Sequence, residues 1–457
     1  MGLRFDGTRR LSAVDVGTGQ PADYTGKDVT GKLVVARSSA FSVGTLVRTA
    51  VEKGAAGLLV TRDTPGATQV LHNTGVTIPV VAATYEDGQA LLDQLARGPV
   101  TVALNGRSES RYAYTVPLNF DGVLPADPTV RTQKADYAEL RNEFHSDVTD
   151  RLANEIMHSW LPWEAGSFRT AHYVKAPAAR SDYVLAADRR YSQNIGSVLV
   201  GAPYMSEPTR SYRAGERVSR DWWRGPAHPG TAGTACSYCR TDTKMTFAAS
   251  PFADSDPSHS AGGGGVTASA ARYYRDGEQI AKTADLLVAE PATYRLEWDL
   301  TRKLGPGIEL GTHSRTAWTF RSQAPTGPGG PGCTAQFPGA AACAALPVIL
   351  VGYDVPVDGR NRAPSGESFE FTVTTKRAAG YSGSASVAGL KVWTSVDGGG
   401  SWQAAQHVGL AGDGRHEVTV RHPKLDDTDG YVALKIETWD AAGNRTTQEI
   451  TRAYALR

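Results

Sequence analysis

The spacing of hydrophobic residues changes character near residue 108. Before that point, short apolar runs alternate with segments whose apolar residues recur three and four positions apart. The runs at Lys32–Arg37 and Ala55–Val60 predict buried strands. Between them, Phe41–Lys53 has helical spacing and is followed by Gly54, a typical helix stop. A strand, a helix and a strand in this order predict a βαβ unit with parallel strands.

The same alternation continues to the end of the first hundred residues. Ile78–Ala82 and Val100–Leu104 predict two more strands, and Tyr85–Leu95 predicts a helix between them. Asn105-Gly106 is a strong turn signal. At the other end, Leu3–Gly7 predicts a strand running into a turn.

Beyond residue 108 the pattern becomes one of short alternating segments, with one candidate helix at Ala135–Asn142. Turn residues separate the segments at short intervals, which favours antiparallel β-sandwiches. The clearest alternating segments are Tyr112–Val116, Ser197–Val200, Tyr294–Trp298, Thr316–Phe320, Ser368–Val373, Leu390–Trp393, His416–Val420 and Tyr431–Ile436.

We therefore expect a multidomain, mainly β protein with an α/β unit at its start. The predicted divisions are an α/β domain at 1–108 and a β-sandwich region, of one or two units, at 109–325. A Pro/Gly-rich linker at 326–345 follows, and then an immunoglobulin- or fibronectin-like sandwich at 346–457. A chain of 457 residues is long enough for several such domains.

Composition excludes two classes of partner. Lys+Arg number 48 and Asp+Glu 47, so the net charge of +1 offers no basic excess for nucleic acid. The longest apolar stretches fall short of the 18 or so residues needed to cross a membrane. The start, Met1–Gly7, lacks the apolar segment of a signal peptide, so we expect this chain to begin inside a larger architecture.

Four cysteines suit a secreted protein with one or two disulfides. They are Cys236, Cys239, Cys333 and Cys343, and three pairings are open. We favour the local pairs, because the members of each are close in sequence. A zinc site is disfavoured because only one CxxC is present. A thioredoxin-like role is disfavoured because no amphipathic helix follows that CxxC.

An ordered series of elements within residues 31–95 carries a family resemblance. It consists of Gly31–Arg37, Phe41, Ala50, Lys53–Val60, Ile78-Pro79, Asp87-Gly88 and Leu91-Leu92. This series resembles the protease-associated (PA) domain, an α/β insert of subtilisin-like proteases, zinc aminopeptidases and sorting receptors. The resemblance implies a domain that covers or restricts an active site, or binds peptide. Arg37 and Phe41 are its candidate ligand contacts. Nucleotide binding is disfavoured, because the turn Arg37–Phe41 lacks a glycine-rich motif.

Two motifs near the end predict structure rather than chemistry. Ser395–Trp402 resembles the Asp-box, a β-hairpin whose Asp accepts from turn amides. Trp439–Arg445 resembles the penultimate turn of bacterial immunoglobulin-like domains. Together with Arg452–Tyr454, it also resembles the C-terminal ends of actinobacterial subtilisin-like proteases.

A serine-protease triad needs a nucleophile, a base and an orienting acid in fixed geometry. The subtilisin motifs for these residues do not occur here. Asp15–Thr18 lacks the context of the acid, His228–Thr231 has a proline where the family has glycine, and Gly233–Cys236 has no serine. His259, in the polar segment Asp254–His259, is a weak metal candidate. We therefore predict no catalytic residues, no metal and no cofactor.

The leading hypothesis is a non-catalytic accessory portion of a secreted subtilisin-like serine protease, whose parent family is a hydrolase. Its partner would be a peptide or protein substrate, reached through the parent's catalytic domain. The alternative is a free-standing secreted protein that binds peptide or glycan, with Trp222 and Trp223 as a stacking surface. An aminopeptidase remnant is a weaker hypothesis, because it needs a His/Asp/Glu ligand set that 109–325 does not show.

Overall fold

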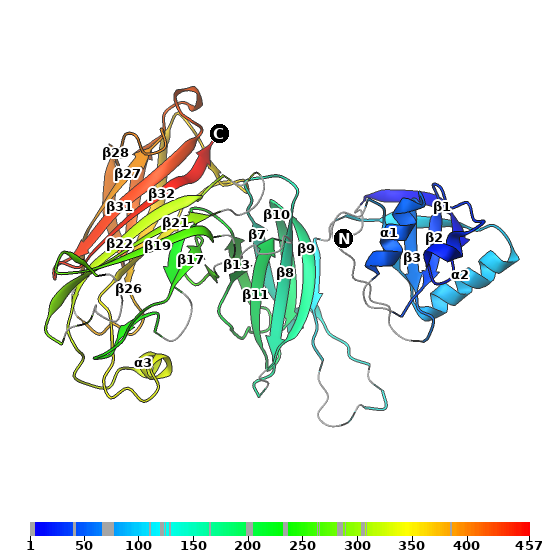
Figure 1. Ribbon diagram of the computed structural model, residues 1–457, viewed down its shortest axis with the longest axis horizontal. Helices are drawn as coiled ribbons and strands as arrows, with labels where there is room; N and C mark the ends of the chain where they lie inside the picture. The colour runs from blue at the N-terminus through cyan, green and yellow to red at the C-terminus, as the bar shows by residue number, and fades with distance from the viewer. Residues whose placement is uncertain are drawn as a thin grey trace. The chain divides into compact units, whose positions relative to one another are not determined.

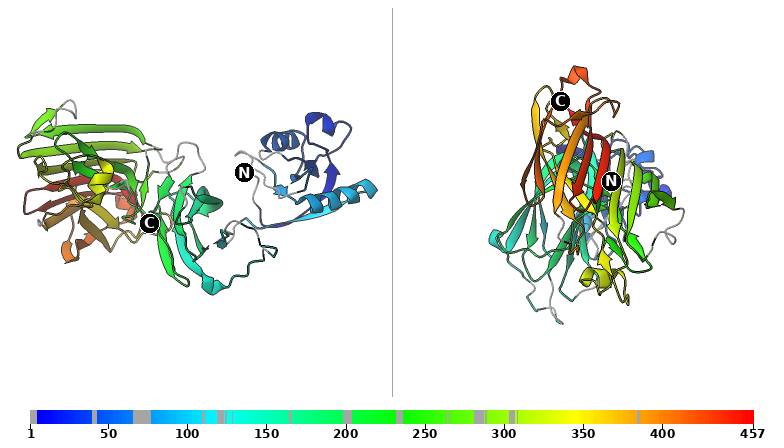
Figure 2. Two further views of the ribbon diagram at one scale, coloured as in Figure 1. Left: turned by 90° about the horizontal axis from the view of Figure 1, so that it is seen from below. Right: turned by 90° about the vertical axis from the view of Figure 1, so that its left-hand side faces the viewer.

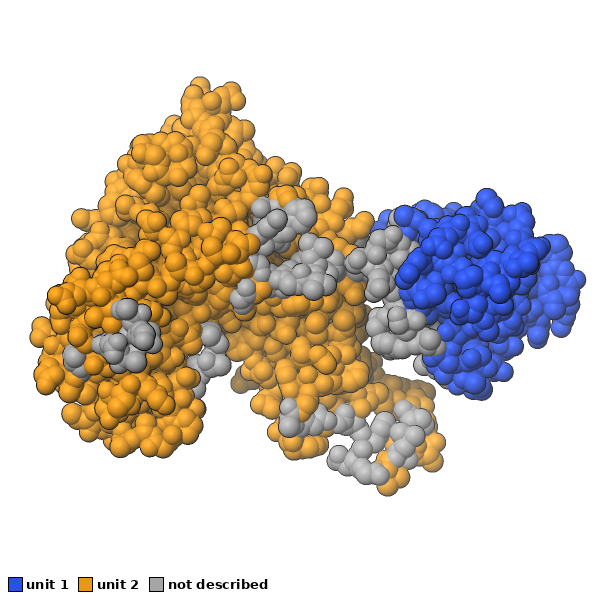
Figure 3. All heavy atoms as spheres, viewed as in Figure 1, with its two compact units in different colours: residues 1–110 blue, residues 111–457 orange. Residues whose placement is uncertain are grey.

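The computed structural model of the chain (Figure 1) divides into two units, residues 1–110 and 111–457 (Figure 3). Among the helices that it describes, none is long and apolar enough to span a membrane. The described residues are 5–39, 43–65, 77–108, 111–118, 123, 125–127, 129–163, 166–197, 204–231, 236–262, 264, 266–280, 287, 289–302, 307, 309–383 and 386–457.

The first unit is a five-stranded sheet with a helix on each face. The strand order is β4-β3-β2-β1-β5; the first four strands are parallel, and β5 is antiparallel to β1. The elements are β1 (Gly7–Asp15), β2 (Leu33–Arg37), α1 (Gly44–Glu52), β3 (Gly57–Thr61), β4 (Val80–Ala82), α2 (Tyr85–Arg97) and β5 (Thr101–Gly106).

Side-chain alternation along β2 explains the two-sided core. Val34 and Ala36 pack with Leu46 of α1, whereas Leu33 and Val35 pack with Leu92 of α2. A strand buried on both faces reads as a continuous apolar run, as is usual in parallel sheets. The predicted βαβ unit is confirmed by the parallel pairing of β2 with β3.

Two predicted turns in this unit are wrong. Asn105 and Gly106 lie inside β5, where they pair with Thr8 and Gly7. Gly7 in turn begins β1 rather than ending a strand. In both cases the β1–β5 ladder keeps the backbone extended, and this pairing between distant segments overrides the local turn preference.

The second unit contains two β-sandwiches. In the first, a four-stranded sheet, β13-β7-β10-β6, faces a seven-stranded sheet, β14-β17-β18-β12-β11-β8-β9. Its strands are β6 (Tyr112–Thr115), β7 (Tyr137–Phe144), β8 (Arg151–Trp160), β9 (Phe168–Ala176), β10 (Ala178–Leu185), β11 (Arg190–Ser197), β12 (Tyr204–Ser206), β13 (Arg217–Trp222), β14 (His228–Thr231), β17 (Ala249–Ala253) and β18 (Ser260–Ala261).

The second sandwich packs a nine-stranded sheet against the four strands β24-β26-β30-β29. The nine strands are β19 (Val266–Arg275), β20 (Glu278–Ile280), β21 (Ala292–Arg302), β22 (His313–Ser322), β25 (Arg362–Ala363), β27 (Val387–Ser395), β28 (Gln403–Ala404), β31 (Tyr431–Asp440) and β32 (Arg445–Leu456). The four are β24 (Ile349–Asp354), β26 (Ser368–Arg377), β29 (His407–Gly412) and β30 (Arg415–Arg421). A small sheet, β15 (Tyr238–Arg240), β16 (Met245–Phe247) and β23 (Ala344–Ala345), and the helix α3 (Pro331–Gln336) complete the unit.

The nine-stranded sheet runs across the segment expected to be a linker. β22 precedes residues 326–345 and β32 follows them, yet His313 to Thr319 pair antiparallel with Thr451 to Arg445. Figure 2 shows the yellow-green and red strands of this sheet side by side. The segments on either side of the expected linker therefore share one sheet.

The helix predicted at Ala135–Asn142 is also wrong. After a 3₁₀ turn at Lys134–Asp136, the chain enters β7, which pairs with β10 on one side and β13 on the other. Leu140, Asn142 and Phe144 alternate as buried positions with period two. Pairing on both edges overrides the helix preference of the Ala, Glu, Leu and Arg residues in this segment.

The hairpin predicted from the Asp-box is confirmed between β27 and β28. The Asp397 carboxylate accepts from the Ser401 backbone N–H at 3.0 Å and from the Ser395 hydroxyl at 2.6 Å. Gly398 and Gly399 take the positive φ that the turn requires, at 69° and 98°. The hydroxyl bonds of Ser395 and Ser401 hold the pKa of Asp397 well below its ordinary value.

A buried charged layer lies inside the first sandwich. Arg180 donates to Asp182 at 2.6 Å and to Glu155 at 2.5 Å, and all three side chains are at most 5% exposed. Burial, and then the Asp182 charge, raise the pKa of Glu155 to about 7, which Arg180 opposes. Two buried carboxylates thus depend on one guanidinium.

We predict that Arg180→Gln lowers the free energy of unfolding by about 3–5 kcal/mol, because it leaves two buried carboxylates without their cation. Urea denaturation of the full chain measures this loss. The matched control is Arg141→Gln, on the adjacent strand β7, where the Arg141 side chain is 55% exposed and contacts Glu139 at 3.2 Å. That change should cost less than about 1 kcal/mol. Equal losses would contradict the prediction.

Two buried histidines of the same unit titrate in opposite directions. Burial disfavours the charge of His259, but Asp254, 3.0 Å from its Nδ1, more than offsets this and holds the His259 pKa above 6.5. Burial lowers the pKa of His228 to about 4. A raised pKa stabilises the fold at low pH, and that contribution is lost as the pH rises through the folded-state pKa; a lowered pKa does the reverse.

The free energy of unfolding of the wild type should therefore exceed that of His259→Gln by more near about pH 5.5 than near about pH 8.5. The advantage over His228→Gln should instead shrink as the pH falls from about 6.5 toward 4, by up to about 3 kcal/mol. Urea unfolding of the three proteins across this range measures both differences. The same pH trend for both variants would refute the assignment of opposite shifts.

Candidate functional site

Polar side chains gather where the parallel strands of the first unit end. β1 ends at Asp15, β2 at Arg37 and β3 at Thr61. Parallel strands place their carboxyl ends at one edge of a sheet, and open α/β sheets bind ligands at that edge. We call Asp15, Arg37, Ser39, Asp63 and Thr84 the carboxyl-edge cluster.

One half of the carboxyl-edge cluster is an ion pair. Arg37 Nη2 lies 3.3 Å from Asp15 Oδ1, and the two side chains are 33% and 37% exposed. Asp15 Oδ1 also accepts from the Gly17 backbone N–H at 2.8 Å, which orients the carboxylate. Because a guanidinium carries five N–H donors and this pair uses only those of Nη2, Arg37 could also contact a carbonyl or carboxylate.

Hydroxyl groups form the other half. Ser39 Oγ donates to the Asp63 carboxylate, and this bond lowers the pKa of Asp63. Thr84 is the N-cap residue of α2, and its Oγ1 accepts from the Asp87 backbone N–H at 3.1 Å. Thr61 Oγ1 donates to the Thr84 carbonyl at 2.9 Å. Ionised and hydroxyl groups in this arrangement suit the polar backbone and charged side chains of a peptide.

The start of α2 lies very close to β3. A Cβ added to Gly88 would lie 1.8 Å from Thr61 Oγ1, so only glycine fits at this point. This close approach brings Thr84 and Thr61 together at the carboxyl edge.

The candidate contact residues of the first unit differ in outcome. Arg37 lies at the strand end, partly exposed, as a contact residue would need to be. Phe41 lies outside the described residues. Asp63, two residues beyond the end of β3, was not predicted as a contact residue; its place directly after a buried strand is the signal that could have found it.

The two tryptophans proposed as a stacking surface pack inside the first sandwich. Trp222 is 0% exposed, stacks on His259 at 4.2 Å and donates from Nε1 to Asn142 at 2.9 Å. Trp223 is half-buried, and its Nε1 donates to the Ile195 carbonyl at 3.2 Å. Because none of its surface is exposed, Trp222 has nothing to offer a ligand. The alternation of β13 places it inward.

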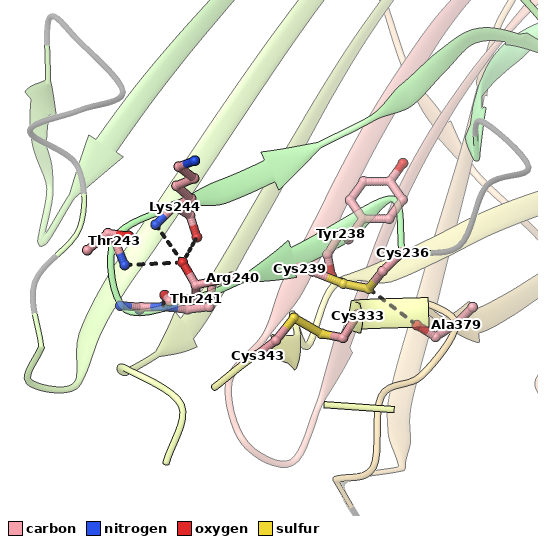
Figure 4. The surroundings of a disulfide bond; sticks show 10 residues. All are labelled: Cys236, Tyr238, Cys239, Arg240, Thr241, Thr243, Lys244, Cys333, Cys343 and Ala379. Carbon is pink, nitrogen blue, oxygen red and sulfur yellow. Dashed lines mark hydrogen bonds between the residues drawn. A yellow bond between two sulfur atoms is a disulfide. The ribbon is translucent and has the colours of Figure 1, made fainter. Parts of the chain in front are cut away.

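The four cysteines form one buried cluster, although the two pairs are far apart in sequence (Figure 4). Cys236 is bonded to Cys239 and Cys333 to Cys343, and each pair has a Cα–Cα distance of 5.9 Å. β15 pairs with β23 next to them, with Cys239 opposite Ala345. The Cys333–Cys343 bond attaches α3 to the residue that precedes β23 of this small sheet. The other metal candidate from the sequence, His259, forms a hydrogen bond through its Nδ1 to the Asp254 carboxylate at 3.0 Å.

Comparison with known proteins matches the first unit. The family model of the PA domain matches residues 8–91. The minor extracellular protease Vpr of Bacillus subtilis (strain 168) is 28% identical over 90 residues, which are 20% of this chain and 11% of Vpr. The chain therefore spans about a tenth of that relative's length.

Two solved structures also match in part. An aminopeptidase from Aneurinibacillus sp. strain AM-1 has 26% identity and a TM-score of 0.20, over 23% of this chain and 26% of its own. BSAP, a zinc aminopeptidase from Bacillus subtilis, has 17% identity and a TM-score of 0.17, over 23% of this chain and 30% of its own. TM-scores of this size do not establish a shared fold. The match to the family model, by contrast, identifies residues 8–91 as a PA domain.

Proposed function

We propose that this chain is the non-catalytic accessory portion of a secreted subtilisin-like serine protease. Its PA domain gates or extends the substrate cleft, and the β-sandwiches space and stabilise the assembly. The observation that carries the proposal is the PA domain at 8–91, whose segment is related to an extracellular bacterial protease. Secretion is consistent with that relative and with the two disulfides.

The carboxyl-edge cluster supplies the chemistry for peptide contact. Arg37 would donate to a substrate carbonyl or carboxylate, and Asp63 would accept from a substrate N–H or cation. Both lie at the edge where α/β sheets bind ligands. Binding energy from such remote contacts helps to position a substrate for a catalytic centre elsewhere.

The purified chain should not hydrolyse casein or a fluorogenic peptide at a rate that a serine-protease inhibitor reduces. Robust hydrolysis abolished by such an inhibitor would contradict the proposal. The upstream reading frame should encode a subtilase catalytic domain.

In the proposed parent protease, which carries both the catalytic domain and this chain, Arg37→Ala should raise KM for protein substrates several-fold. It should leave kcat for a short peptide unchanged. The matched control is Arg48→Ala, exposed on α1 and away from the strand ends. An equal effect of both changes would show that the edge does not contact substrate.

A free-standing peptide- or glycan-binding protein is the second candidate, and exposed tyrosines favour it. Tyr112 and Tyr114 of β6 are 55% and 58% exposed, and the Tyr114 ring stacks on Tyr183 at 5.0 Å. Aromatic faces of this kind stack on sugars or peptides. A glycan or peptide array should then show a ligand of about micromolar or tighter Kd, lost in the Tyr112→Ala/Tyr114→Ala variant. If the array shows no such ligand, the free-standing binding function is contradicted and the accessory function is retained.

A further inference from the structure

Three potential metal ligands meet where β7 and β13 end. The two strands are parallel neighbours, with Asp221 opposite Glu143 and Trp222 opposite Phe144. His145 follows β7 directly, and its backbone N–H donates to the Trp222 carbonyl at 2.9 Å, which continues the ladder. Because side chains alternate along a strand, Glu143 and His145 share one face, with Asp221 beside them.

The ligand atoms are close together. His145 Nε2 lies 3.5 Å from Asp221 Oδ1 and 4.0 Å from Glu143 Oε2. All three ligand atoms lie within 4.8 Å of one another. Ligands bound tetrahedrally to zinc at about 2.0–2.1 Å are about 3.4 Å apart. The Asp221 spacing already fits, and Glu143, whose side chain is 66% exposed, has room to move inward.

The orientation of the His145 ring points to a cation. Its Nδ1 lies 3.2 Å from the Asp358 carbonyl, which can only accept, so Nδ1 carries a proton. In a neutral ring, Nε2 then presents a lone pair toward two carboxylates, which cannot donate to it. The side chain is 3% exposed, and Nε2 makes no hydrogen bond to the described residues. A buried Nε2 that faces two carboxylates needs a positive charge between them, supplied either by a second ring proton or by a metal ion.

The nearby arginine does not fill this position. Arg224 Nη1 lies 3.4 Å from Asp221 Oδ2, the carboxylate oxygen other than the one facing His145. Arg224 also pairs with Asp354, which draws its guanidinium toward β24. Asp221 can therefore hold Arg224 through one oxygen and a metal ion through the other.

We propose that Glu143, His145 and Asp221 bind a divalent transition-metal ion, with Zn²⁺ as the best fit. Imidazole together with carboxylates suits zinc, whereas Ca²⁺ and Mg²⁺ take oxygen ligands. The Asp358 carbonyl on Nδ1 is the outer contact that commonly orients a metal-binding histidine. Three protein ligands leave one position for water.

The bound ion would stabilise the contact between the two sandwiches. Asp358 lies between β24 and β25 of the second sandwich, and the Ser146 backbone N–H donates to the Gly359 carbonyl at 3.0 Å. Fixing His145 therefore also fixes the strand connection against which it packs. Binding to the folded state alone raises the unfolding temperature.

The test uses the full chain with both disulfides intact and no free thiol by a colorimetric assay, because reduced cysteines also bind zinc. Calorimetric titration should give one Zn²⁺ per chain, with a Kd of about 10 µM or tighter, and Zn²⁺ should raise Tm. Glu143→Gln, at an exposed position that should leave folding intact, and Asp221→Asn should each weaken binding at least about tenfold. His145→Gln should abolish it.

The matched control is His313→Gln, which removes a surface histidine whose Nε2 lies 2.8 Å from Asp299. It should leave the affinity and the Tm shift unchanged. The proposal is overturned if the wild type binds no Zn²⁺ below about 100 µM, or if Glu143→Gln binds as tightly as the wild type. It is also overturned if NMR shows a doubly protonated His145 ring that Zn²⁺ does not perturb.

Discussion

The ladder between β22 and β32 determines the architecture of the second sandwich. It joins a strand that ends at Ser322 to one that begins at Arg445, and so unites the strands before residue 326 with those after it in one sheet. That sheet packs against β24, β26, β30 and β29 on one side of the core, and its early strands β21 and β22 supply part of another cluster around Tyr238. Without this ladder, the second sandwich would lose the strands contributed before residue 326.

Polar contacts join the two sandwiches at several points. Arg302 of β21 is 2% exposed and donates to the Pro251 carbonyl of β17 at 3.0 Å and to Ser314 at 2.9 Å. Asn361, beside β25, donates to the Trp223 carbonyl at 3.2 Å and accepts from the Gly225 N–H at 3.0 Å. Buried polar groups hold specific geometry only when their partners are present. These contacts therefore favour a single arrangement of the two sandwiches.

Local periodicity predicts the first unit well because its elements follow one another in sequence. The runs 32–37 and 55–60 and the helical spacing between them correspond closely to β2, β3 and α1. Pairing between distant segments is what the pattern does not contain. For this reason the β22–β32 ladder was not predicted, the segment 135–142 forms β7 instead of a helix, and Asn105-Gly106 lies inside β5 instead of in a turn.

The same limit governs the candidate sites. Arg37 could be predicted because it ends a buried strand of the series that resembles the PA domain, whereas the inward orientation of Trp222 depends on how β13 packs. The cluster of Glu143, His145 and Asp221 could not be predicted, because it exists only through the parallel register of β7 with β13. The residues 145–216 separate the two strands in sequence, and neither strand segment contains a metal motif by itself.

The two units differ in the physical role of their polar groups. In the second unit, the charges of Arg180, Glu155 and Asp182 are nearly inaccessible, and they stabilise a particular packing. In the PA domain, Asp15 and Arg37 keep about a third of their surface exposed at a strand edge. Exposed charges contribute little to stability, so this pair is available for the substrate contact that we propose. The proposed recognition role of the PA domain thus rests on partly exposed charges, whereas the buried charges of the sandwich serve packing.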